Sequence, residues 1–205
     1  MKIDLPPPDT TNTKSLNSVI AKRRSYREFS EASIDLREIS VLLWAAQGLT
    51  GSENKRTTPS AGAQYPSQIY VVVVNISDLS PGIFQYCSHE HSLDLKTKKD
   101  FRKEFFSAAI DHQPWGLEAA MILVLTADFE LMKTHFFEQP PRGKRGDRYI
   151  YLEAGSIAQN VQLQASCIDL GAVLVGGFDD EKVQKLLGVN ESIKPTALIC
   201  IGKRK

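Results

Sequence analysis

The stretch YIYLEAGSIAQNVQLQASCIDLGAVLVGGFDD, residues 149–180, holds the clearest pattern in the chain. Apolar and small residues recur through its first two thirds at a helical period, at Ile150, Ala154, Ile157, Val161, Ala165 and Ile168. This spacing predicts a helix over 149–170 that Gly171 ends. The opposite side is also apolar, at Leu152, Ala158 and Leu163, so in a chain of 205 residues this helix must be central or buried in an oligomer interface.

Working outward from this stretch, hydrophobic period and capping residues predict the remaining elements. Helices are expected at 15–23, at 36–47 between Asp35 as N-cap and Gly48 as stop, at 99–109, and between Asp179 as N-cap and Gly188 as stop. Strands are expected at 69–74, 83–87, 92–95, 120–126, 172–175 and 196–201. The proline-containing start, residues 1–14, is predicted to be an extended arm, and the basic segment 133–148 a mobile loop.

Composition limits the class of protein. The chain has 205 residues, 42% of them hydrophobic and 24% charged, which fits one folded domain over residues 1–205. A formal net charge of +1 argues against nucleic acid as a partner. The chain has no run of about 18 apolar residues and no apolar signal segment at its start, so neither a membrane span nor secretion is predicted. We therefore expect a cytoplasmic protein.

The number and spacing of the cysteine and histidine residues do not match a metal site. Three cysteines, at 87, 167 and 200, lie far apart in apolar segments, as reduced core thiols do. The four histidines, at 89, 91, 112 and 135, lack cysteine or acidic partners at ligand spacing. The chain also lacks GxSxG and GxGxxG, so if it is an enzyme we expect a cofactor to supply the reactive group.

Three arginines, Arg23, Arg24 and Arg27, fall within five residues around Ser25. Guanidinium groups are permanently charged, bidentate donors that suit a phosphate or the carbonyl edge of a ring. The alternative is a solvated helix end, where arginines complement the negative end of the helix dipole.

Two further segments are small and nearly bare of side chains. The loop Pro59-Ser60-Ala61-Gly62 would let a flat ligand or another subunit approach its backbone, or it is a plain turn into the following strand. The turn Val175-Gly176-Gly177 can expose backbone N–H donors to a bound ring or anion, or it is an ordinary connection between strand and helix.

Taken together, these motifs resemble the FMN-dependent nitroreductase family. RRSYREF (23–29) resembles its N-terminal Arg-x-Ser-x-Arg/Lys signature, and residues 154–180 resemble its long helix and flavin-facing turn. SAGAQYP (60–66), with LLWAAQGLTG (42–51) and PGIFQY (81–86), resembles the SagB-type dehydrogenase branch more than the classical nitroreductases. The resemblance covers about 180 residues, nearly the whole chain.

The resemblance implies an α+β fold with a central mixed, largely antiparallel sheet flanked by helices, in an intertwined homodimer with FMN at the subunit interface. The residues it would place on FMN come from three segments and from Lys203 near the C-terminus. Arg23, Arg24, Ser25 and Arg27 would meet the phosphate, ribityl chain and pyrimidine edge, and Lys203 would lie near the phosphate. Pro59, Ser60, Ala61 and Gly62 would approach from the partner subunit, and Val175, Gly176 and Gly177 would place a backbone N–H near flavin N5.

The resemblance also implies an activity. It suggests hydride transfer through flavin N5 with ping-pong kinetics, from NAD(P)H to a nitroaromatic, a quinone or another small electrophile. Some SagB-type enzymes, which oxidise azolines in peptides with partner proteins, carry a Lys-Tyr pair in a mobile loop. Lys144-Arg145 is the nearest match to that pair, which makes Lys144 the candidate catalytic residue. A third interpretation is an FMN-binding protein without turnover of its own.

Overall fold

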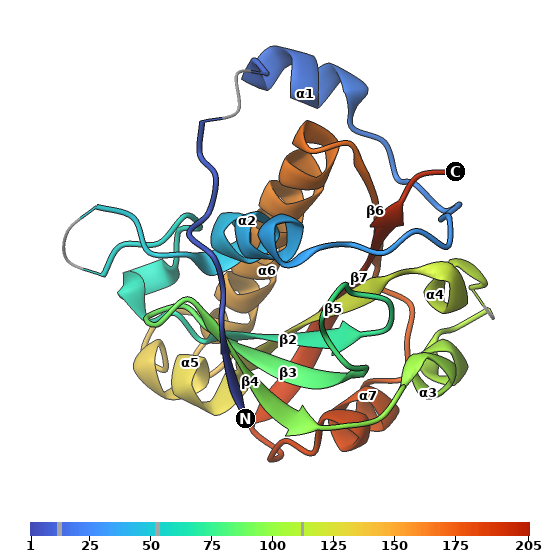
Figure 1. The fold of residues 1–205 in the computed structure, drawn as a ribbon. Helices are drawn as coiled ribbons and strands as arrows, with labels where there is room; N and C mark the ends of the chain where they lie inside the picture. The colour runs from blue at the N-terminus through green and yellow to red at the C-terminus, as the bar shows by residue number, and fades with distance from the viewer. Residues whose placement is uncertain (12–13, 52–53, 112) are drawn as a thin grey trace.

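A seven-stranded sheet forms the centre of the computed structural model, which describes residues 1–11, 14–51, 54–111 and 113–205 (Figure 1). The strands lie in the order β1 (Lys2–Asp4), β4 (Ser92–Thr97), β3 (Gly82–Cys87), β2 (Ser67–Val73), β5 (Met121–Asp128), β7 (Ile193–Lys203) and β6 (Leu170–Val175). Every neighbouring pair is antiparallel, and among the described residues parallel pairing occurs at isolated bridges such as that between Ser25 and Ala172. The predicted α+β fold with a largely antiparallel sheet is therefore confirmed.

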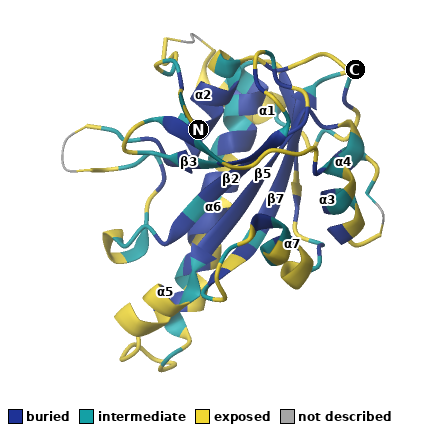
Figure 2. Ribbon diagram, turned by 60° about the horizontal axis from the view of Figure 1, so that its bottom comes forward, coloured by how far each residue is buried: buried dark blue, intermediate teal, exposed yellow. Residues whose placement is uncertain are grey.

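Helices cover both faces of this sheet (Figure 1). The first face is covered by α2 (Leu36–Gln47) and α6 (Arg145–Cys167), and the second by α3 (Arg102–Ala108), α4 (Trp115–Glu118) and α7 (Asp180–Leu187). Two helices lie outside these layers: α1 (Leu16–Lys22) stands beside the C-terminal end of α6, and α5 (Phe129–His135) projects with the start of α6 (Figure 2). A short 3₁₀ turn, Ala61–Ala63, precedes β2.

The central strands are apolar on both sides because both faces of the sheet are covered. In β2, Ile69, Val71 and Val73 belong to the core under α2 and α6. Tyr70 and Val72, which point the other way, belong to the core under α3 and α7. The strands accordingly appear as the buried layer in Figure 2.

The predicted capping of α2 is confirmed. The Asp35 carboxylate accepts from the N–H groups of Arg37 and Glu38, both at 2.8 Å, and Glu38 Oε2 accepts from the Asp35 N–H at 3.0 Å. Gly48 ends the helix for a different reason from the one predicted. Its φ of −63° is not left-handed, but a Cβ atom at this position would lie 2.3 Å from Trp44 Cδ1. At α7, by contrast, Gly188 has the left-handed φ of 65° expected of a helix stop.

The prediction of a loop over 133–148 is wrong at both ends of this segment, where the structure has helices. Residues 133–135 belong to α5, and α6 begins at Arg145 rather than at residue 149. Close packing explains the early start, because a Cβ atom at Gly146 would lie 2.6 Å from the Met132 carbonyl carbon. The helix also ends at Cys167, so Gly171 does not stop it but lies inside β6.

The N-terminal arm is more structured than predicted. Residues 2–4 form β1 against β4, and residues 12 and 13 of the predicted arm lie outside the described residues. His91 anchors the arm: its Nε2 lies 2.7 Å from Ser40 Oγ and 3.2 Å from the Pro6 carbonyl oxygen, and its Nδ1 lies 2.9 Å from the Tyr86 hydroxyl. Burial lowers the pKa of His91, which favours a neutral structural imidazole.

Candidate functional site

The arginine segment lies against the ends of β6 and β7. Tyr26 donates its N–H to the Ala172 carbonyl at 2.9 Å, and Ser30 donates to the Lys203 carbonyl at 2.9 Å. We call residues 23–27 together with Lys203 the arginine corner. Lys203 is the last residue of β7, which extends two residues beyond the predicted strand 196–201.

Two glycines allow this close approach. Gly171 of β6 and Gly202 of β7 are paired directly opposite each other in the sheet. A Cβ atom at Gly171 would lie 2.7 Å from Tyr26 Cδ1, and one at Gly202 would lie 2.8 Å from Phe29 Cδ1. Because these two glycines lack side chains, the arginine segment can pack directly against β6 and β7.

The three arginines of the corner form no ion pair with any carboxylate in the part of the chain that the structure describes. Arg23 Nη1 donates to Gln162 Oε1 at 3.2 Å, and Arg24 Nη1 donates to backbone carbonyls, including its neighbour's at 2.7 Å. The Arg27 guanidinium lies over the Trp115 ring, 5.4 Å from its centroid. Their positive charges therefore remain available to an anion.

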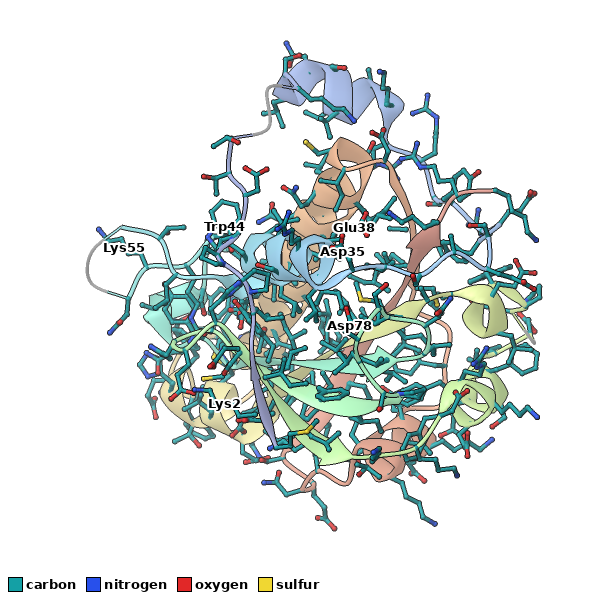
Figure 3. All side chains as sticks on the ribbon, in the orientation of Figure 1. Lys2, Asp35, Glu38, Trp44, Lys55 and Asp78 are labelled. Atoms are coloured by element: carbon teal, nitrogen blue, oxygen red, sulfur yellow. The ribbon has the colours of Figure 1, made fainter. Side chains whose placement is uncertain are left out.

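Lys203 differs from the arginines because it has an acidic partner. Its ammonium forms an ion pair with Glu38 Oε1, while the other oxygen of Glu38 caps α2 through the Asp35 N–H. Asp35 and Glu38 lie together at the first turn of α2 (Figure 3). The predicted phosphate contact of Lys203 would therefore compete with this ion pair. The sequence prediction missed Glu38 as its partner.

Backbone N–H donors lie just after the end of β6, the edge strand that contacts the arginine segment. Gly176 is exposed, and neither its N–H nor that of Gly177 has a hydrogen-bond acceptor among the described residues. The Gly177 carbonyl accepts from the Ile110 N–H at 2.9 Å, which holds the turn in place. Gly176 is four strand residues beyond Ala172, a span of about 13 Å. Val175 offers backbone only, because its side chain is 4% exposed in the core.

Pro59, Ser60, Ala61 and Gly62 do not reach the arginine corner within one chain. They precede Ser67, which pairs with Ala127 near one end of β5, whereas the corner adjoins Ile201, which pairs with Met121 at the other end. Six strand residues separate the two ends, which is about 20 Å. Within one chain, the loop and the corner therefore lie near opposite ends of β5.

The loop is held in a specific conformation. Gly62 has a left-handed φ of 60°, and Ser60 Oγ accepts from the Tyr65 N–H at 2.9 Å. A Cβ atom at Gly62 would lie 3.2 Å from Phe136 Cζ, so the loop rests on the end of α5. Ala61 packs on the same small cluster, which contains Phe136 and Tyr149.

A buried polar network that the sequence prediction missed ties this loop to α2 and α6. Glu153 Oε1 accepts from Ser67 Oγ at 2.7 Å and from Gln47 Nε2 at 3.3 Å, and Arg56 Nη1 donates to Gln47 Oε1 at 2.9 Å. The Arg56 guanidinium also lies 4.5 Å from the centroid of the Tyr65 ring. Burial lowers the pKa of Arg56, against the opposing effects of Tyr65 and Glu153.

Lys144 lies far from the arginine corner. It is the exposed N-cap residue of α6, whereas Gln162, the partner of Arg23, lies 18 residues further along that helix, about 27 Å away. Lys144 instead lies at the end of α6 that is near the loop at 59–62, since Tyr149 of this helix and Ala61 of the loop pack against the same cluster around Phe136.

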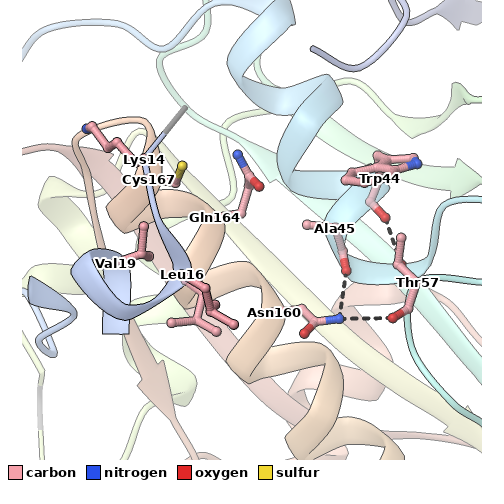
Figure 4. A pocket seen from close by; sticks show the side chains of 10 residues that line it. Lys14, Leu16, Val19, Trp44, Ala45, Thr57, Asn160, Gln164 and Cys167 are labelled. Atoms are coloured by element: carbon pink, nitrogen blue, oxygen red, sulfur yellow. Dashed lines mark hydrogen bonds between the residues drawn. The ribbon is translucent and has the colours of Figure 1, made fainter. Parts of the chain in front are cut away.

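A groove of about 390 Å³ opens between α1, α2 and α6 (Figure 4). Its walls are mainly apolar, with Leu16, Val19, Trp44 and Leu163 among the lining residues. Asn160 Nδ2 spans its floor, donating to the carbonyls of Ala45 and Thr57, each at 3.2 Å. None of the predicted site residues lines this groove, so it is a separate feature.

Other site types find no support in the described ranges. No group of His, Cys, Asp and Glu there could hold a metal ion, and His112 lies outside those ranges. No helix among the same residues is long and apolar enough to cross a membrane. The cysteines at 87, 167 and 200 form no disulfide with a described residue, and burial raises the pKa of Cys200 to about 12.

The fold and the corner define a class: an α+β protein whose edge strand β6 has guanidinium groups without acidic partners near its start and backbone N–H donors without acceptors after its end, among the described residues. The chain belongs to the nitroreductase family, whose model matches residues 20–203. It is accordingly an oxidoreductase of that family, whose members generally bind a flavin.

Individual relatives agree with this assignment. The Methanocaldococcus jannaschii protein MJ1384, whose name places it among the nitroreductases, is 35% identical over 204 residues, which cover 100% of this chain and 97% of its own length. A similarly named Ralstonia eutropha protein has a crystal structure with a TM-score of 0.82 at 28% identity, covering 100% of this chain and 90% of that one. A chain of the E. coli microcin synthetase McbBCD complex, solved with truncated pro-MccB17, has a TM-score of 0.76 at 22% identity, covering 90% and 70%, which shows a shared fold.

Proposed function

We propose that this protein is an FMN-dependent oxidoreductase of the cytoplasm. It takes hydride from NAD(P)H and passes it to a small electrophile, such as a nitroaromatic or a quinone, in a ping-pong cycle. When bound, the flavin supplies hydride chemistry at N5. The carrying observation is that Arg23 and Arg24, which form no ion pair among the described residues, adjoin Ser25 where it pairs with Ala172 of the edge strand β6, and that the free N–H groups of Gly176 and Gly177 follow the end of the same strand.

The residues of the corner fit FMN by their chemistry. Arg23 and Arg24 would bind the phosphate, since guanidinium groups donate bidentate hydrogen bonds to phosphate oxygens. Ser25 would donate to the ribityl chain. Arg27, held over Trp115, would place a permanent positive charge at the pyrimidine edge of the ring, where it favours negative charge. The free N–H groups of the Gly176–Gly177 turn would orient the ring at N5.

The site is completed in a homodimer. Because the loop at 59–62 cannot reach the corner of its own chain, we assign it to the partner's flavin. Leu152, 63% exposed on α6, and Leu16, 64% exposed on α1, offer apolar surface for that contact. The sequence prediction placed Ala158 with Leu152 on the second apolar side of α6, but Ala158 is 1% exposed and belongs to the core of its own chain.

Flavin binding is the first test. The purified protein should be yellow, with the absorbance bands of bound FMN, and NADH or NADPH should bleach those bands under anaerobic conditions. A colourless protein that takes up no added FMN would overturn the proposal. Bound FMN that no dihydronicotinamide reduces would favour a flavin-binding protein without this turnover.

A second candidate is a SagB-type dehydrogenase that oxidises a modified peptide with partner proteins. The observation that favours it is the shared fold with a chain of the McbBCD complex, which was solved with a peptide. In that case Lys144 would act on the peptide. Lys144→Ala would then abolish reduction of the flavin by an azoline peptide while leaving FMN binding intact. Unchanged turnover of that peptide would remove Lys144 from the mechanism.

A further inference from the structure

Three cations at the start of α6, Lys144, Arg145 and Arg148, form no ion pair with an acidic residue within the described ranges. Nearby cations do: Lys133 lies 3.3 Å from Glu130 and Arg142 lies 3.2 Å from Glu138. The guanidinium of Arg145 donates to the Pro140 carbonyl, which is neutral. We call these three residues the basic tip.

The spacing of the basic tip concentrates its charge. Lys144 and Arg148 are four residues apart and Arg145 and Arg148 are three apart, so their side chains neighbour each other at the start of one helix. All three lie within about 6 Å of helix rise. Like charges so placed repel each other, and a compact polyanion would relieve that repulsion.

An exposed aromatic ring lies beside Gly143, the residue that precedes these cations in the chain. Phe137 is 49% exposed in the connection between α5 and α6. Gly143, with a left-handed φ of 69°, turns the chain back onto it, donating its N–H to the Phe137 carbonyl at 3.0 Å. A Cβ atom at Gly143 would lie 3.3 Å from Phe137 Cε2, so the backbone runs close beside the ring. A flat apolar ring beside clustered cations suits a base that carries phosphates.

The basic tip is linked to the loop at 59–62 through the ring of Phe136. Tyr149, one residue after Arg148, packs edge-on against Phe136, with ring centroids 4.7 Å apart. Gly62 rests on the same Phe136 ring. A contact between this loop and the partner's flavin would therefore bring the basic tip to the mouth of the same site.

We propose that the basic tip binds the phosphate groups of NADPH, with the adenine against Phe137, and so makes NADPH the preferred electron donor over NADH. This rests on the proposed function, which takes a reduced nicotinamide dinucleotide as the donor. A dinucleotide matches the observations because it combines an aromatic base with several phosphates in a short span. An acidic peptide would need neither the ring nor such tight clustering.

A binding test needs no turnover. Isothermal titration of the purified protein with adenosine 2′,5′-bisphosphate should show binding that weakens about tenfold in Lys144→Ala and in Arg148→Ala, since each removes a charge-assisted hydrogen bond. Phe137→Ala should weaken it as well. Lys133→Ala and Arg142→Ala, which remove paired cations from the same projection, should leave it unchanged.

A kinetic test compares donors with and without phosphates. In Lys144→Ala and Arg148→Ala, KM for NADPH should rise about tenfold with kcat unchanged, because binding is lost equally in the ground and transition states. Reduction of the flavin by 1-benzyl-1,4-dihydronicotinamide, which has no phosphate, should not change.

Several outcomes would overturn the phosphate site. The first is unaltered bisphosphate binding in Lys144→Ala, Arg148→Ala and Phe137→Ala, and the second is an equal loss with the benzyl compound. The third is a glutamate-rich peptide that displaces the bisphosphate and binds independently of Phe137. That last result would mark a peptide surface. A wild-type protein whose FMN the benzyl compound cannot reduce would overturn the proposed function instead, while the bisphosphate titration still decides the phosphate site.

Discussion

The arginine corner and the basic tip both carry cations without acidic partners, but they are built differently. The corner is fixed by backbone hydrogen bonds to β6 and β7 and by the opposed glycines Gly171 and Gly202. The tip stands on the projecting end of α6, supported by the small side-chain cluster around Phe136 (Figure 2). Charges of the same kind thus lie on a sheet at one site and on an outlying projection at the other.

This difference suggests two kinds of ligand. A cofactor that stays bound through many turnovers benefits from groups whose positions are set in advance, since little ordering is left for binding. A substrate that must enter and leave in each cycle is suited to an exposed attachment point. The corner therefore fits FMN and the tip fits the donor, and the following predictions test that division.

The largest expected effect is loss of the corner charges. Arg23→Ala with Arg24→Ala should raise the dissociation constant of FMN at least about a hundredfold, because each charge-assisted contact with phosphate contributes about 1.5–3 kcal/mol. Quenching of FMN fluorescence measures this. The matched pair Lys144→Ala with Arg148→Ala should change FMN affinity less than about twofold. Equal losses in the two pairs would contradict the division.

Gly202→Val should disrupt the packing of the arginine segment against β7. The new side chain would overlap Phe29, which is 2% exposed, and such overpacking should lower the free energy of unfolding by about 2–3 kcal/mol. Urea denaturation of the flavin-free protein measures it. Gly155→Ala, where the added Cβ meets nothing within 4 Å, should be neutral or stabilise α6 by up to about 1 kcal/mol. Similar stability of the two variants would show that the arginine segment does not need a glycine at position 202 in order to pack against β7.

Glu153→Ala should destabilise the end of the molecule that carries the basic tip. It leaves Ser67 Oγ and Gln47 Nε2 buried without their acceptor, at a cost of about 2 kcal/mol in unfolding free energy. Glu153→Gln keeps an acceptor oxygen and should lose about half as much. Thermal and urea unfolding together check this. Full stability of the alanine variant would show that the network does not support the loop at 59–62.

The smallest expected effect has the opposite sign. Glu38→Gln removes the charged partner of Lys203, which frees its ammonium for a phosphate, and FMN affinity should rise by about threefold, within the range of half-exposed ion pairs. Stability should fall by less than about 1 kcal/mol. Glu104→Gln, which breaks the remote pair with Lys99, should leave FMN affinity unaltered. A weaker FMN complex in Glu38→Gln would mean that Glu38 holds Lys203 in its binding position.

Much of the fold could be predicted because its elements repeat a pattern over many residues. The capping box of α2, the buried run of β2 and the glycine stop of α7 are local features, and each is confirmed. Two of the elements that were missed, β1 and α4, span three and four residues, too few for a period to show. The third, α5, has seven residues, as many as α1 and α3, which were predicted. The early start of α6 depends on packing of Gly146 against α5, which no local pattern contains.

For the candidate site, the residue types could be read locally but their partners could not. The clustered arginines and the paired glycines are visible as short runs in the chain. Which cations remain unpaired depends on contacts such as Lys203 with Glu38, 165 residues apart. The separation of the loop at 59–62 from the corner likewise appears only in the register of β5 with its neighbours.

Sequence alone thus determined the helices and strands with long repeats, the family resemblance and the set of candidate residues, because these depend on side chains close together in the chain. Tertiary structure alone decided that Gly171 and Gly202 face each other under the arginine segment, and that Lys144 lies with the loop at 59–62 rather than with Arg23. The physical reason is that strand register and helix packing fix distances between residues far apart in sequence, and those distances determine which charges are neutralised and which stay open to a ligand.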